Sequence, residues 1–143
     1  MDIRPITETY AVSPQISVED VQTLADKGFT TVICNRPDAE IPPSHHADVI
    51  QQAVEELGMR FVDIPIHPTG LSQDVIAIHK EAIDTSDGPV FAYCASGNRS
   101  TLIWALTQAG LQPTDAIISA GAAQGYNVEM LRGMIDMLAS QRS

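Results

Sequence analysis

The chain has 143 residues, of which 44% are hydrophobic and 18% charged, a composition typical of one globular domain with one core. Its 18 acidic side chains outnumber 8 basic ones, and the net charge of -10 disfavours nucleic acid and anionic membrane surfaces as partners. No apolar run approaches the roughly 18 residues that cross a bilayer, and the N-terminal segment lacks the features of a secretory signal. We therefore expect one cytoplasmic domain over residues 1–143.

Apolar runs bounded by turn residues alternate with segments of helical period, which is typical of a sheet with helices on its faces. The sequence predicts four short strands, at about residues 9–12, 30–34, 61–64 and 89–93. It predicts six helices, at about residues 17–28, 44–58, 72–85, 100–110, 114–123 and 127–139. This order indicates an α/β fold with a mostly parallel sheet of four or five strands. In the last helix Met130, Met134 and Met137 repeat at helical spacing, and we expect them to pack in the core.

The segment YCASGNRS, residues 93–100, joins the fourth predicted strand to the fourth predicted helix. The strand places Cys94 at the edge of the sheet, Gly97 is free to adopt positive φ, and the following helix points its positive end at the same place. Backbone N–H groups in such a turn bind anions. We therefore expect an oxyanion, such as phosphate or sulfate, to be bound by the amides of Ala95, Ser96, Gly97 and Asn98.

Three side chains of this segment are candidates for chemistry. Arg99 carries a planar fork of donors that binds tetrahedral oxyanions through two bonds, and Ser100 can donate its hydroxyl to the cysteine sulfur or to a leaving group. A helix N-terminus and a guanidinium lower a cysteine pKa from about 8.5 to roughly 3.5–7.5, so Cys94 is predicted to be a thiolate nucleophile. The alternative is that Cys94 is an inert residue buried at a strand end.

Together with the segment TVICNRPD, residues 31–38, this loop resembles the bacterial beta-lactamase hydrolase-like phosphatase domain family. The resemblance extends over about residues 5–140. The family is a branch of the protein tyrosine phosphatase superfamily, and the resemblance implies a dual-specificity-phosphatase-like fold. It also implies a cysteine-dependent phosphatase that hydrolyses phosphomonoesters through a thiophosphoryl intermediate on Cys94.

The loop departs from the usual superfamily signature, His-Cys-x5-Arg, at two points. Tyr93 precedes Cys94, and only four residues separate Cys94 from Arg99. This shorter spacing is similar to the loop of rhodaneses, which carry sulfane sulfur on the cysteine, although their other marker, G-H-I-P-G-A, is absent. A thiosulfate- or persulfide-type sulfurtransferase, with Cys94 as the persulfide carrier, is therefore the alternative function.

The general acid is a third departure. Phosphatases of this class use an Asp on a loop roughly 30 residues before the cysteine, where this chain has the segment DIPIHPTGLSQD. Asp63 falls inside a predicted strand, and Asp74 is explained as a first-turn helix residue. His67 is the candidate acid, with a solvated loop histidine as the alternative. If the acid is weak, the substrates should be aryl phosphates of the phosphotyrosine type.

Two residues of the TVICNRPD segment have open interpretations. Arg36 follows a strand that should end at the same sheet edge as Cys94, so it could enlarge the anion pocket or pair with Asp38 in a proline turn. Cys34 is either an inert core residue or a resolving thiol for Cys94. No cysteine or histidine spacing indicates zinc, so we expect no metal and no cofactor. The physiological substrate and the oligomeric state stay open.

Overall fold

A five-stranded sheet forms the centre of the molecule in the computed structural model, which describes residues 1–68 and 70–142. The strands lie in the order β1-β2-β5-β3-β4. Their bounds are β1 (Arg4–Pro5), β2 (Tyr10–Ser13), β3 (Thr31–Cys34), β4 (Arg60–Asp63) and β5 (Val90–Tyr93). All neighbours are parallel except β1, which pairs antiparallel with β2. The mostly parallel α/β sheet predicted from the sequence is confirmed.

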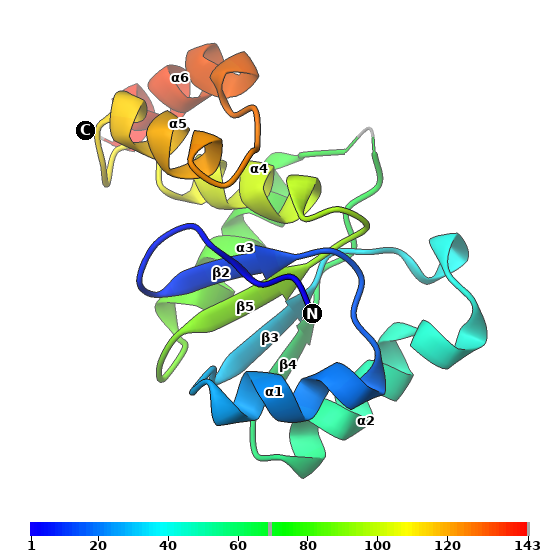
Figure 1. The fold of residues 1–143 in the computed structure, drawn as a ribbon. Helices are drawn as coiled ribbons and strands as arrows, with labels where there is room; N and C mark the ends of the chain where they lie inside the picture. The colour runs from blue at the N-terminus through cyan, green and yellow to red at the C-terminus, as the bar shows by residue number, and fades with distance from the viewer. Residues whose placement is uncertain (69, 143) are drawn as a thin grey trace.

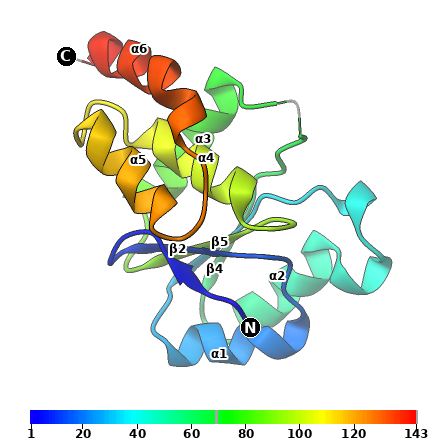
Figure 2. The same ribbon diagram turned by 45° about the horizontal axis from the view of Figure 1, so that its top comes forward.

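Helices cover both faces of this sheet (Figures 1 and 2). On one face lie α1 (Val21–Asp26) and α2 (Ala47–Glu56), and their apolar residues form a core cluster with Val32, Phe91 and Tyr93 of the sheet. On the other face lie α3 (Gln73–Asp84), α4 (Asn98–Thr107), α5 (Thr114–Ala122) and α6 (Arg132–Arg142). Because α4 has other helices and the sheet around it, its residues from Ser100 to Thr107 are all buried.

The strand boundaries agree closely with the sequence pattern, whereas helix boundaries differ by up to five residues, since α6 begins at Arg132 and not at residue 127. Each of the four predicted strands is present within one residue of the expected bounds, and Ser72 caps α3 by accepting a hydrogen bond from the Val75 N–H. The pattern missed β1, since a two-residue strand that contains a proline carries no alternation. It also started α4 two residues late, because the helix begins at Asn98 rather than Ser100.

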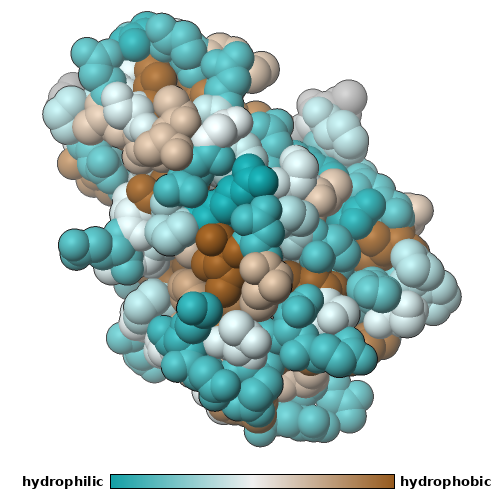
Figure 3. Space-filling model, viewed as in Figure 1, coloured by the Kyte–Doolittle hydropathy of each residue, from teal (hydrophilic) through white to brown (hydrophobic). Residues whose placement is uncertain are grey.

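The predicted core role of the three methionines near the C-terminus is wrong. Met130 is 69% exposed, and Met134 and Met137 are also exposed, whereas Ile135 and Leu138 carry the buried face of α6. The methionine spacing followed the helical period, but the neighbouring β-branched and leucine residues have the same period on a different face. Hydrophilic residues cover most of the surface in Figure 3, with apolar residues in small separate areas.

Parallel pairing brings the carboxyl ends of four strands to one edge. Ser13, Tyr93, Cys34 and Asp63, the last residues of β2, β5, β3 and β4, are in register with their neighbours. The segments that follow these residues therefore meet at this edge, which is where open α/β sheets bind ligands. Over the described part of the chain, no helix is both long and apolar enough to span a bilayer.

Candidate active site at the cysteine loop

Cys94 directly follows β5 and begins the loop that leads into α4. Gly97 is the N-cap of α4 and has φ of +92°, a conformation that only glycine adopts without strain. In this conformation the Gly97 N–H donates a hydrogen bond to Cys94 Sγ at 3.1 Å. The sulfur therefore lies against a backbone donor at the positive end of a helix, as the sequence predicted.

Tyr126, in the segment after α5, supports the loop from behind. Its hydroxyl donates to the Ser96 carbonyl at 2.9 Å, and a Cβ added at Gly97 would lie 2.2 Å from the same hydroxyl oxygen. The guanidinium of Arg4 lies over the Tyr126 ring at 5.4 Å from its centroid. The absence of a side chain at Gly97 thus allows both the turn and this close approach. Sequence analysis missed Tyr126, which is far from the motif in the chain.

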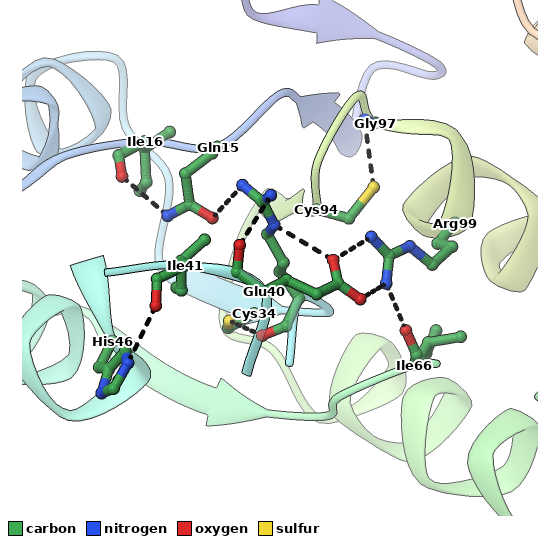
Figure 4. A network of polar contacts seen from close by, with 11 residues as sticks. Gln15, Ile16, Cys34, Glu40, Ile41, His46, Ile66, Cys94, Gly97 and Arg99 are labelled. Carbon is green, nitrogen blue, oxygen red and sulfur yellow. Dashed lines mark hydrogen bonds and ion pairs between the residues drawn. The ribbon is translucent and has the colours of Figure 1, made fainter. Parts of the chain in front are cut away.

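Arg99 is held by two acceptors outside the loop (Figure 4). Its Nη1 donates to the Ile66 carbonyl at 2.7 Å and to Glu40 Oε2 at 2.9 Å, while its Nη2 donates to Glu40 Oε1 at 2.7 Å. A guanidinium has five N–H groups, so these bonds leave the Nε–H and one Nη2–H, which form a second fork. Arg99 lowers the pKa of Glu40 through these hydrogen bonds. Glu40 thus orients Arg99, and the Nε–H and the second Nη2–H take no part in these contacts.

Arg36 binds the other side of the same carboxylate. Its Nε donates to Glu40 Oε1 at 3.3 Å, and its Nη1 donates to Gln15 at 3.4 Å. The predicted alternative pairing with Asp38 is wrong: Asp38 Oδ1 instead accepts the N–H of Ala47 at the start of α2. The carboxylate of Glu40 therefore bridges Arg36 and Arg99. The sequence pattern did not identify Glu40 as a site residue, because its partner Arg99 lies 59 positions away in the chain.

Ser100 is fully buried and its hydroxyl donates to Asn35 Oδ1 at 2.8 Å. We expected this hydroxyl to point to the sulfur or to a leaving group, and in the structure its proton is directed to Asn35. Asn35 in turn donates from Nδ2 to the Ile64 carbonyl and from its backbone to the Tyr93 carbonyl, and its own carbonyl accepts the Ile66 N–H. Asn35 thereby joins the ends of β3, β4 and β5 to the first turn of α4.

A cavity of about 280 Å³ lies over the loop, and His67 contributes to its wall. Its described lining consists of Ile66, His67, Pro68, Leu71, Ala95, Ser96, Asn98, Arg99 and Leu102, which include no carboxylate. The structure thus brings the candidate acid, an exposed side chain, to the residues of the loop. Asp63 lies beside Cys34, where partial burial and Asp38 raise the pKa of its carboxyl. Asp74 is exposed in the first turn of α3.

Cys34 lies at the end of β3 with its sulfur in a different environment. Its Sγ donates to the Arg36 carbonyl at 3.4 Å, and burial raises the pKa of its thiol to about 11. Both cysteines are free, and Figure 4 shows their sulfur atoms apart from one another. Cys34 packs in the core cluster beneath α1 and α2, so the inert interpretation fits this placement better than the resolving one.

Among the described residues, no group of three or more His, Cys, Asp or Glu side chains could hold a metal ion. A larger groove, of about 400 Å³, lies at the opposite edge of the sheet between the N-terminal hairpin and the end of α1. Its lining includes Lys27 and Glu8 but neither cysteine. In the part of the chain that the structure describes, a cysteine sulfur, an arginine side chain and a helix N-terminus come together at the cysteine loop.

The sheet order and the loop between β5 and α4 define a single-domain α/β protein with the protein tyrosine phosphatase fold. The chain belongs to the family described as "Beta-lactamase hydrolase-like protein, phosphatase-like domain", whose model matches residues 2–111. A Beta-lactamase hydrolase-like protein of Xylella fastidiosa (strain Temecula1) is 29% identical over 130 residues. That match covers 90% of this chain and 30% of the relative, so the chain spans about a third of the relative's length.

Solved structures agree with this assignment. A candidate phosphatase from Neisseria meningitidis is 31% identical, with a TM-score of 0.82 over 96% of this chain and 99% of that chain. The TpbA protein of P. aeruginosa, solved in complex with pTyr, is 16% identical, with a TM-score of 0.61 over 93% of this chain and 89% of that chain. At that identity the second likeness shows the fold alone. The family and fold implied by the two sequence motifs are thus confirmed.

Proposed function

We propose that this domain is a cysteine-dependent phosphatase in which Cys94 is the nucleophile. The observation that carries the proposal is the meeting of the Cys94 sulfur, the Gly97 N–H and the Arg99 fork at the N-terminus of α4. Membership in a phosphatase-like family and the likeness to the Neisseria protein support it. Buried, preorganised donors at such a site stabilise negative charge that develops on a transferred group.

The reaction has two steps. The Cys94 thiolate attacks the phosphorus of a phosphomonoester, an S–P bond forms, and the bond from phosphorus to the leaving oxygen breaks. The leaving oxygen takes its electron pair and a proton. A water molecule then attacks the phosphorus, releases inorganic phosphate and restores the thiolate. Throughout, the second fork of Arg99 and the amides of residues 95–98 hold the phosphoryl oxygens, while Glu40 keeps Arg99 in place.

We propose aryl phosphates as the substrate class, and the residues that line the cavity support this choice. The described lining holds Ile66, Leu71 and Leu102 beside the loop, which suits an aromatic ring, and it offers His67 in place of a carboxylic acid. An aryl oxide leaves with less help from a proton than an alkoxide does. The TpbA complex with pTyr is a precedent for such a ligand on this fold. We therefore infer a phosphotyrosine-like substrate, with His67 as its proton donor.

A sulfurtransferase is the second candidate function, and the described lining without a carboxylate favours it together with the four-residue spacing between Cys94 and Arg99. In that reaction the Cys94 thiolate attacks the sulfane sulfur of thiosulfate, the S–S bond breaks, and sulfite leaves with the electron pair. Cyanide then takes the sulfur as thiocyanate and restores the thiolate. Sulfite needs no proton to leave, so this chemistry requires no general acid.

One preparation assayed for both reactions decides between them. The phosphatase predicts turnover of p-nitrophenyl phosphate, no turnover of phosphoserine, and complete dependence on Cys94. His67→Ala should slow phenyl phosphate more than p-nitrophenyl phosphate, because the poorer leaving group needs the proton more. Thiocyanate production with a persulfide mass increment on Cys94, and no turnover of aryl phosphates, would replace the phosphatase with the sulfurtransferase.

A further inference from the structure

A chain of buried polar groups lies behind the cysteine loop and plays no part in the chemistry described above. Tyr10, the first residue of β2, donates from its hydroxyl to the Ser100 carbonyl at 2.8 Å. The same hydroxyl lies 3.1 Å from Nε2 of His79, which belongs to α3. His79 and Ser100 have no exposed surface and Tyr10 is almost fully buried. Three elements are thus joined through one phenolic oxygen.

The direction of each hydrogen bond follows from the number of protons. Tyr10 has one hydroxyl proton, and the Ser100 carbonyl can only accept, so the proton is directed to that carbonyl. The Tyr10 oxygen must then accept from His79, which requires the tautomer with a proton on Nε2. In this tautomer Nδ1 is a bare lone pair. Nδ1 of His79 is buried, with no hydrogen-bond partner among the described residues.

Stability alone does not explain a histidine at this position. Burying Nδ1 without a partner costs free energy of folding, and an apolar side chain would avoid that cost. Burial also lowers the pKa of His79 to about 3, so the ring is neutral near pH 7. The neutral ring donates its one N–H to the Tyr10 oxygen, so the Tyr10 hydroxyl proton is directed to the Ser100 carbonyl. Trp104, stacked on Tyr10 with ring centroids 6.0 Å apart, holds the phenol from another side.

This series of buried hydrogen bonds ends at Ser100, close to the proposed nucleophile Cys94. Ser100 follows Arg99 in the first turn of α4, and it is held at two points: its carbonyl by Tyr10 and its hydroxyl by Asn35. Tyr10 is also close enough to Cys94 that a thiolate there adds to the effect of burial in raising the pKa of the phenol. The orientation of this first turn sets where the Gly97 N–H and the Arg99 fork lie relative to the sulfur.

We propose that Tyr10, oriented by the Nε2–H of His79, is a positioning residue that holds the first turn of α4 and thereby makes Cys94 reactive. This role rests on the proposed function in that it concerns the same nucleophile. It predicts an effect on the sulfur itself, which can be measured without any substrate. Failure of the phosphatase assay and failure of this proposal are therefore separate outcomes.

The test measures alkylation of Cys94 by iodoacetamide across pH, followed by peptide mass spectrometry, in the wild type, three test variants and one control variant. Tyr10→Phe keeps the ring and removes the donor to Ser100, and should slow Cys94 alkylation at pH 6 by about two- to tenfold, the effect of one neutral hydrogen bond. His79→Leu should act in the same direction. His79→Gln retains an N–H donor and should restore most of the rate.

Tyr93→Phe is the matched control. It removes another buried tyrosine hydroxyl, one that lies beside Cys34 instead of Ser100, and should leave Cys94 alkylation unchanged. If folded Tyr10→Phe alkylates at the wild-type rate with an unchanged pH profile, the residue is structural only and the proposal is wrong. Nitrogen NMR of the wild type provides a test that needs no variant: a proton found on Nδ1 of His79 in place of Nε2 would also overturn it.

Discussion

Cys34 and Cys94 occupy equivalent places in the fold and are both buried, but their sulfur atoms have different hydrogen-bond partners. Each lies at the carboxyl end of a buried parallel strand, on adjacent strands β3 and β5. The sulfur of Cys34 donates to a backbone carbonyl, whereas the sulfur of Cys94 accepts from a backbone N–H. The two sulfur atoms thus have opposite hydrogen-bonding roles, and burial raises the pKa of the Cys34 thiol. We therefore expect the residues that follow each cysteine, and not its position at a strand end, to decide its reactivity.

Charge adds to this contrast between the two strand ends. Beside Cys34 lie Asp63 and Asp38, which add to burial in raising the pKa of its thiol to about 11. Beside Cys94 lies the guanidinium of Arg99. Asp63, which falls in the chain region where a general acid is expected, therefore lies beside the cysteine that we expect to be inert.

Replacing the two cysteines should give the largest difference. Cys94→Ser should lower kcat by at least about 10³-fold, because serine in this loop has no adjacent base to activate it. Cys34→Ala should leave kcat within about twofold, since the Cys34 sulfur contacts the Arg36 carbonyl and packs in the core cluster outside the cysteine loop. The measurement is p-nitrophenyl phosphate turnover on folded variants. Comparable losses from both substitutions would contradict the comparison.

Gly97→Ala should have the next largest effect. The substitution places a Cβ in the left-handed region, at about 1–2 kcal/mol, and against the Tyr126 hydroxyl. We expect urea unfolding to show a loss of at least about 2 kcal/mol and activity to fall about 100-fold, as the N–H on the sulfur moves. Gly28→Ala is the control, with φ of +90° and nothing within 4 Å of the new Cβ. It should cost only the backbone penalty and leave activity unchanged.

Glu40→Gln tests how the arginine on the Cys94 side is oriented. The substitution removes the charge that holds the Nη1 and Nη2 edge of Arg99, so the second fork should lose its fixed direction. We expect kcat/KM to fall about tenfold, the effect of a weakened charge-assisted pair. Glu55→Gln, on the exposed face of α2, should have no effect. Tighter binding of inorganic phosphate to Glu40→Gln would instead mean that Glu40 competes with the anion for Arg99.

The pH dependence of stability should show a smaller effect, which comes from His79 in the polar network behind the cysteine loop. The pKa of His79 is lowered from 6.5 to about 3 by burial, so between these values the unfolded chain binds the proton and the folded chain does not. The free energy of unfolding should therefore fall as the pH drops below 6.5, by up to about 1.4 kcal/mol per pH unit from this group. Urea titrations of the wild type and His79→Leu from pH 7 to 4 measure it. Equal slopes would contradict a buried neutral His79.

The sequence predicted most of the fold and the loop but few of the side chains that hold the loop. The strand bounds followed from β-branched runs and turn residues, and the loop from Gly97 and Arg99, because these signals are local. Glu40, Tyr126 and Asn35 carry no local signal, since each acts through a contact distant in the chain. The proton of Ser100 was misplaced for the same reason: its acceptor lies 65 positions away.

Alkylation of both cysteines in one native sample at pH 7 measures the difference between Cys94 and Cys34 directly. At a pKa of about 11, roughly one Cys34 in 10⁴ is a thiolate at this pH, so Cys34 should stay unmodified until the chain is unfolded. Cys94 should react at least about tenfold faster, and phosphate or vanadate should slow it by occupying the loop. Equal reaction of the two cysteines, or reaction at Cys94 that no oxyanion slows, would contradict the account.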